Sequence, residues 1–220
     1  MTNNGGVTLA DVSVRPAQPA DAEAIARIQL AAWRATLGEQ VVDGLDADAV
    51  AETWRRAAGA APDPRARVLV AVAGPTVVGF AACAPSSGSL RVPDGEAFDG
   101  ERPAHGEPAT GERPTGDHRD GEPSSDGGGW TAELLALEVA PDARRAGHGS
   151  RLLAAVADLA RERGAHHLAT WTVRSDAERT AFLEAAGLGE AGLRRRLDVP
   201  GGEVEEILLT AVLPAHGSAR

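Results

Sequence analysis

The sequence contains no lysine and no tyrosine, and it has a single cysteine among 220 residues. Every one of its 22 basic residues is an arginine. A Walker-type phosphate loop requires a lysine, so the composition excludes that class of nucleotide site. Cys83 cannot form an internal disulfide, and because it lies in an apolar run we expect a small buried side chain there.

Long apolar runs are also missing. No run approaches the roughly 20 residues that span a bilayer, and residues 1–10 lack the basic and apolar regions of a signal peptide. We therefore expect a cytoplasmic protein without a membrane partner. The formal net charge of −10 argues against a nucleic-acid partner, although it is compatible with a local basic pocket for a phosphorylated cofactor.

The first part of the chain has the periodicity of a strand, two helices and a β-hairpin. These elements are expected at residues 12–15, 21–38, 46–59 (with a start at 48 as the alternative), 67–73 and 76–84. Trp54 is expected to pack in the core. Trp33, near the end of the first helix, is a candidate to line the cleft for an acceptor substrate.

The composition changes abruptly over residues 86–129. These 44 positions hold ten glycines, five prolines and ten acidic residues against four arginines. So few apolar groups cannot offset the entropy of ordering, and we expect a disordered acidic insert. Its histidines have no metal-ligand spacing. A role for the insert in docking a basic partner protein stays open as an alternative.

Regular patterns resume at Trp130. The sequence predicts a strand through Val139, a helix to Arg163, and then a strand, a helix and a closing hairpin at 167–173, 177–186, 192–197 and 203–213. Asp176 is expected to cap the last helix. The prediction is one domain over 12–213, interrupted by the insert, with flexible ends at 1–11 and 214–220.

The turn at residues 144–150 joins a strand to an amphipathic helix. Gly147 and Gly149 lack the Cβ atoms that would hold a ligand away from the backbone, so successive N–H groups can point at one anion. The positive end of the helix reinforces such a site. The turn is therefore predicted to bind a phosphate.

The order of these elements resembles the GNAT superfamily of N-acetyltransferases. Members carry Gln/Arg-x-x-Gly-x-Gly/Ala after the fourth strand, and Arg144, Gly147 and Gly149 stand at those positions. The resemblance extends to Val14-Arg15-Pro16-Ala17 near the start and to Phe182 with Gly187-Leu188 near the end. It implies a mixed α/β fold, the GNAT-like acyl-CoA N-acyltransferase fold, with the insert between the third and fourth strands.

The resemblance implies an enzyme that moves an acetyl group from acetyl-CoA directly to a primary amine. The acceptor is a small molecule or a peptide whose identity stays open, no metal is needed, and a homodimer is compatible with the family. The turn amides would hold the coenzyme pyrophosphate. The residues assigned to coenzyme binding are Leu137, Glu138, Val139, Arg144, Arg145, Ala146, Gly147, His148, Gly149, Ser150, Asp176 and Phe182.

Two catalytic groups follow from the same resemblance. Glu133, taken as the start of the fourth strand, is the candidate base, with a solvated carboxylate as the alternative. The Val139 backbone amide would polarise the thioester carbonyl. Strict alternation along a strand predicts that residues 133, 135, 137 and 139 share one face.

One position departs from the family pattern. Many relatives have a tyrosine that protonates the leaving thiolate, and Leu183 stands there instead. A thiolate, with a thiol pKa of about 8.5, can leave without such help, and water or Ser175 could supply the proton. The missing tyrosine keeps an alternative open, in which the protein is a non-catalytic acyl-CoA-binding sensor or regulatory module.

Overall fold

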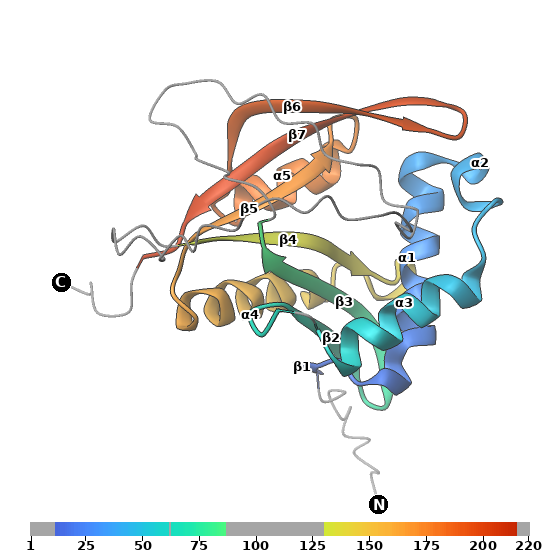
Figure 1. Cartoon of the computed structure of the whole chain (residues 1–220), viewed down its shortest axis with the longest axis horizontal. Coiled ribbons are helices and arrows are strands. Elements are labelled where there is room, and N and C mark those ends of the chain that lie inside the picture. Colours follow the sequence, from blue (N-terminus) through green and yellow to red (C-terminus); the bar gives the residue numbers. More distant parts are fainter. Residues whose placement is uncertain (1–11, 62, 87–129, 215–220) are drawn as a thin grey trace, which may run out of the picture.

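The computed structural model describes residues 12–61, 63–86 and 130–214. Their central feature is one mixed sheet of seven strands in the order β1-β2-β3-β4-β5-β7-β6 (Figure 1). The strands are β1 Val12–Pro16, β2 Arg67–Ala73, β3 Thr76–Pro85, β4 Trp130–Val139, β5 Ala165–Val173, β6 Gly189–Val199 and β7 Gly202–Val212. Only the β4–β5 pair is parallel; every other neighbouring pair is antiparallel.

Helices cover both faces of the sheet. They are α1 Ala22–Leu37, α2 Glu39–Val42, α3 Ala47–Gly59, α4 His148–Glu162 and α5 Ala177–Ala185. α1 and α3 enclose one apolar core against β2 and β3. In this core the rings of Trp54 and Phe80 pack edge to face, with their centroids 5.0 Å apart. α4 and α5 enclose a second, larger core on the opposite face, which includes Cys83 (Figure 1).

Side-chain caps fix where the helices begin. The Asp46 carboxylate accepts a hydrogen bond from the Asp48 amide at 2.9 Å, and Asp176 accepts one from the Arg179 amide at 3.0 Å. Each cap satisfies an amide that has no partner within its own helix. Asp176 therefore caps α5, as the sequence predicts.

β4 and β5 separate part-way along their length. Their ladder runs from Trp130 paired with Ala165 to Glu133 paired with Ala169, and it does not continue along the rest of either strand. Beyond that point the Thr170 hydroxyl donates a hydrogen bond to the Leu134 carbonyl at 2.9 Å. The two strands thus enclose a gap that opens toward their carboxyl ends.

A β-bulge interrupts β4 at Leu135. Its pairing with β3 passes from Leu134 to Ala136, and Leu135 has no partner in the register. Ala132 and Leu134 pack on the α4 face before the bulge, whereas Leu137 packs there after it. The predicted common face for residues 133, 135, 137 and 139 is therefore wrong, because an extra residue reverses the alternation of the strand.

Most of the predicted elements are confirmed, including the hairpin of β2 and β3 and the closing hairpin of β6 and β7. Glu133 is not at the start of β4, which begins three residues earlier at Trp130. The short helix α2 was not expected from the sequence. The predicted flexible ends and disordered insert lie almost wholly outside the described residues, and the gap at 87–129 falls between β3 and β4.

Candidate active site

The larger of two adjoining hollows, here called the turn cleft, has a volume of about 550 Å³. It is bounded by the end of β4, the turn before α4 and the exposed side of α5. Its lining residues are Thr36, Leu137, Glu138, Val139, Ala143, Arg144, Arg145, Gly147, His148, Gly149, Ser150, Asp176, Glu178, Arg179, Ala181 and Phe182. Of the predicted coenzyme-binding residues, all except Ala146 are in this lining.

The backbone of the turn is arranged to bind an anion. Arg145 and Gly147 both have left-handed backbones, with φ of 62° and 79°. Within the described part of the chain, no acceptor is recorded for the amides of residues 147–150, while the Arg151 amide already donates to the Gly147 carbonyl at 3.1 Å. These four amides stand at the positive end of α4, and they are available to a negatively charged ligand.

Two further features of the turn fit a bound ligand. His148 is buried, and its Nδ1 has no hydrogen-bond partner although it lies beside the turn cleft. A buried nitrogen in this state loses its hydrogen bond to water without a replacement. A Cβ on Gly149 would lie 3.6 Å from Phe182 and 3.7 Å from Val139, so a larger side chain would fill the floor of the cleft.

The gap between β4 and β5 exposes backbone groups of β4. Arg179 Nη1 donates to the Leu137 carbonyl at 2.9 Å, so that carbonyl points into the gap. The Ala140 amide donates in the other direction, to Val78 of β3 at 2.8 Å. Because successive amides of a strand point to opposite sides, the Val139 amide points into the gap. This orientation supports, without testing, the predicted role of the Val139 amide.

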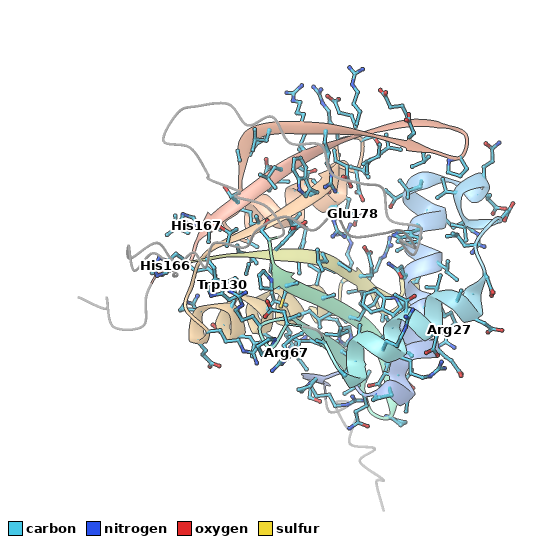
Figure 2. The ribbon with its side chains drawn as sticks, viewed as in Figure 1. Arg27, Arg67, Trp130, His166, His167 and Glu178 are labelled. Atoms are coloured by element: carbon cyan, nitrogen blue, oxygen red, sulfur yellow. The ribbon has the colours of Figure 1, made fainter. Side chains whose placement is uncertain are left out.

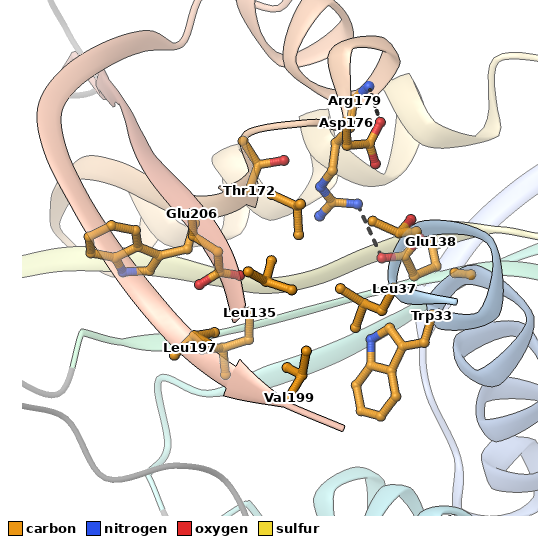
Figure 3. Close-up of a pocket in the computed structure, with 15 residues that line it drawn as sticks. Trp33, Leu37, Leu135, Glu138, Thr172, Asp176, Arg179, Leu197, Val199 and Glu206 are labelled. Atoms are coloured by element: carbon orange, nitrogen blue, oxygen red, sulfur yellow. Dashed lines mark hydrogen bonds and ion pairs between the residues drawn. The ribbon is translucent and has the colours of Figure 1, made fainter. Parts of the chain in front are cut away.

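A second hollow, here called the small cavity, lies on the other side of the gap and has a volume of about 150 Å³ (Figure 3). It is enclosed by α1, β5 and the β6–β7 hairpin. Its lining is mainly apolar and aromatic: Ala32, Trp33, Thr36, Leu37, Leu135, Glu138, Trp171, Thr172, Val173, Asp176, Arg179, Leu197, Val199, Val204 and Glu206. Trp33, the predicted acceptor contact, is therefore in this cavity.

The two hollows share four lining residues: Thr36, Glu138, Asp176 and Arg179. Arg179 Nη1 contacts Glu138 Oε1 at 3.1 Å, and the Glu138 side chain is 19% exposed (Figure 3). Burial raises the pKa of the Glu138 carboxyl above its ordinary value, whereas Arg179 and Arg144 act in the opposite direction. The sequence reasoning assigned Glu138 only to coenzyme binding, and its position between two hollows depends on the bulge.

The other predicted groups lie elsewhere. Glu133 is 4% exposed and lines neither hollow, and because of the bulge at Leu135 it shares its sheet face with Glu138. Ser175 is also absent from both linings, and Leu183 is fully buried in the α4 core. Figure 2 shows His166 and His167 at the start of β5, at the end of the sheet away from α1. The role of Glu133 stays a prediction.

Comparison with known proteins agrees with this arrangement. The sequence model of the acetyltransferase (GNAT) family matches residues 24–188. The chain belongs to the GNAT acetyltransferase family. Membership confirms the resemblance and the fold, and it makes acetyl-CoA the acyl donor. A search of curated protein sequences finds no match.

Solved structures share this GNAT fold. A ribosomal-protein-alanine N-acetyltransferase from Brucella melitensis is 21% identical with a TM-score of 0.62, covering 91% of this chain and 99% of its own. A protein described as an acetyltransferase from Salmonella typhimurium, solved with its cofactor acetyl-CoA, is 20% identical with a TM-score of 0.60, covering 96% and 98%. An N-acetyltransferase from Staphylococcus aureus is 17% identical with a TM-score of 0.59, covering 93% and 99%.

Other kinds of site are not found among the described residues. No group of three His, Cys, Asp or Glu residues in that part of the chain is arranged to hold a metal ion. None of its helices has the length and the apolar run needed to cross a membrane.

Proposed function

We propose that this protein transfers the acetyl group of acetyl-CoA directly to a primary amine that enters the small cavity. The observation that carries the proposal is the junction of the two hollows. The turn cleft has the free amides and the volume for a pyrophosphate ligand, and it meets a smaller apolar cavity at Glu138 and Arg179. Direct transfer needs such a junction, because the reacting atoms must approach to about 3–3.5 Å.

Each group at the site has a chemical task in this proposal. The amides of residues 147–150 hold the pyrophosphate, and the buried His148 Nδ1 gains a polar partner. The bound coenzyme supplies an activated thioester. The Val139 amide faces the gap, where it stabilises negative charge on the thioester carbonyl oxygen as the amine attacks. Arg179 binds the Leu137 carbonyl within the gap.

The composition of the small cavity supports an amine acceptor. Its ionisable lining residues are Glu138, Asp176 and Glu206 against Arg179. Two tryptophans, Trp33 and Trp171, line the same space. Arg179 pairs with Glu138, and Arg195 pairs with Glu206 and lies over the Trp171 ring, so Asp176 and the Trp33 ring are the groups that favour an ammonium group over an anionic substrate. A volume of about 150 Å³ favours an amine carried on a compact side chain or end group.

The test combines acetyl-CoA binding with thiol release. Calorimetry on the wild-type protein is expected to show saturable acetyl-CoA binding, and a panel of primary amines is expected to include at least one that releases free thiol. Gly147→Val adds a branched side chain at a left-handed position beside the anion site, and it is expected to abolish binding. Folded wild-type protein that does not bind acetyl-CoA would contradict the proposal.

A second candidate is a non-catalytic acyl-CoA-binding module. It is favoured by the lack of any tyrosine and by the buried Leu183 at the position where relatives carry one. This candidate predicts acetyl-CoA binding without thiol release for every amine tested. The acceptor's identity and a docking role for the insert stay open, and a homodimer and a cytoplasmic location stay predictions.

A further inference from the structure

Only a few residues form the junction between the turn cleft and the small cavity. Of the four shared residues, Thr36 has a hydroxyl, Arg179 is a permanent cation, and only Glu138 and Asp176 carry carboxylates. An amine in the small cavity can meet a thioester in the turn cleft only at this junction. A group that removes a proton from the amine must therefore be within reach of the junction.

The two carboxylates differ in how their oxygens are used. Asp176 Oδ1 accepts the Arg179 amide at 3.0 Å, which commits this side chain to capping α5. Glu138 Oε1 accepts Arg179 Nη1 at 3.1 Å, and within the described residues no partner is recorded for its Oε2. Arg179 is itself fixed by the Leu137 carbonyl. Each carboxylate thus has one anchored oxygen and one without a recorded partner among the described residues, and Glu138 is preferred because its anchor is the Arg179 side chain in the gap and not a helix-capping amide.

We propose that Glu138 is the catalytic base that takes a proton from the acceptor amine, with Arg179 as the residue that positions its carboxylate. This proposal rests on the acetyl transfer proposed above. It replaces Glu133 in that role, because Glu133 is buried in the closed part of the β4–β5 ladder and lines neither hollow. Both residues are on β4 and on the same face, which makes Glu133 a matched control.

Charged groups from several elements act on Glu138. Arg179 and Asp176 come from the start of α5, and Arg144 comes from the turn after β4. Across the small cavity lies Glu206 of β7, paired with Arg195 of β6, while α1 contributes only the neutral Thr36 to the junction. Burial raises the pKa of the Glu138 carboxyl, and Asp176 adds to this effect against the two arginines. A more basic carboxylate is a better proton acceptor near neutral pH.

The proton count of the reaction closes with a single base. The amine arrives as an ammonium ion, and Glu138 takes one of its protons to give the neutral nucleophile. The nitrogen forms a bond to the carbonyl carbon, the carbon–sulfur bond breaks, and its electron pair goes to sulfur. The nitrogen gives its second proton to water, and sulfur takes one proton from water, so no hydroxide is left. The products are an amide, a free thiol and one proton, which Glu138 passes to solvent.

The test compares Glu138→Gln with Glu133→Gln in thiol-release assays with acetyl-CoA and benzylamine, 2-phenylethylamine and n-butylamine. The side-chain amide introduced by Glu138→Gln retains an oxygen that can accept from Arg179, so the fold is expected to stay unchanged, and the acetyl-CoA Kd is measured separately from the rate. Glu138→Gln is expected to lower kcat/KM by about 100-fold or more at pH 7. It is also expected to remove the acidic limb of the pH profile, which is the fall in kcat/KM at low pH that protonation of the base causes. Activity is expected to recover above the amine's own pKa, where neutral amine is abundant.

Glu133→Gln is expected to keep the acidic limb, and Arg179→Gln is expected to shift it to higher pH because the carboxylate loses its cation. The inference is overturned if the wild-type protein turns over and Glu138→Gln keeps both its rate and its acidic limb, or if only Glu133→Gln loses the limb. If the wild-type protein binds acetyl-CoA and releases no thiol with any amine, the proposed function fails first and this inference fails with it.

Discussion

Thr170 Oγ1 donates a hydrogen bond to the Leu134 carbonyl at 2.9 Å, directly beyond the last paired residues of β4 and β5. Both residues are almost fully buried. The contact joins the two strands at the point where they separate. It therefore marks where the gap begins, four residues before Glu138 along β4.

Replacing Thr170 by Val is expected to lower the free energy of unfolding by about 1 kcal/mol, because the hydrogen bond is lost and a buried carbonyl loses a donor. Thr172→Val is the control, since Thr172 is also buried but its Oγ1 has no partner. That substitution is expected to be neutral or stabilising. Urea unfolding of both variants measures the difference, and equal losses would contradict the assignment.

Arg145 occupies a left-handed backbone with φ of 62°, a conformation that costs a non-glycine residue about 1 kcal/mol. Its side chain is 85% exposed and forms only a 3.4 Å ion pair with Glu178. We expect Arg145→Gly to be more stable than Arg145→Ala by about 1 kcal/mol, because only glycine relieves the strain. Thermal unfolding of the two variants tests this order, and the reverse order would mean that the backbone is unstrained.

Gly79 lets β3 approach the end of β4. A Cβ at this position would lie 2.9 Å from the Glu138 carbonyl oxygen and 3.3 Å from both Leu152 and Val139. Gly79→Ala is expected to cost about 1–3 kcal/mol through this overpacking and to weaken acetyl-CoA binding by displacing Val139. Gly189→Ala, where a Cβ meets nothing within 4 Å, is the control. Denaturant unfolding and calorimetry give the two readouts, and wild-type values for Gly79→Ala would show that β4 can shift freely.

Glu138 also affects the pH dependence of stability. Because burial raises the pKa of its carboxyl in the folded state, its contribution to stability is complete below the unfolded pKa and is lost as the pH rises through the folded pKa. Relative to Glu138→Gln, the wild-type protein is expected to lose stability as the pH rises above the ordinary carboxyl pKa of about 4.3. Urea unfolding at several pH values measures this, and a wild-type advantage that grows with pH would contradict it.

The features that the sequence predicts correctly are those that neighbouring residues specify by themselves. The Asp176 cap depends on residues three positions apart, and the turn at 144–150 depends on two glycines next to a helix, so neighbouring residues are sufficient to recognise both. The bulge at Leu135 could not be predicted in this way. It exists because the residues on either side of Leu135 pair with two successive positions of β3, and that register depends on a strand which ends more than 40 residues earlier in the chain.

The same limit affected the choice of catalytic base. Alternation alone places Glu133 with Leu137 and Val139, and it gives Glu138 no special position. Only after the strand reverses its faces does Glu138 point toward α1 and α5, between the two hollows. A glutamate beside an apolar strand end, shortly before the exposed turn, was the available signal, but it does not specify a face.

The unpaired Leu135 has a consequence for how this strand can change. Deleting that one residue would remove the bulge and leave Leu134 and Ala136 on their present β3 partners, so the side chains after it would keep their faces. Glu138 would stay opposite Phe80, and Val139 would stay opposite Gly79. The sheet register can therefore absorb one single-residue deletion at the bulge, whereas a second one would reverse the faces of the residues that follow.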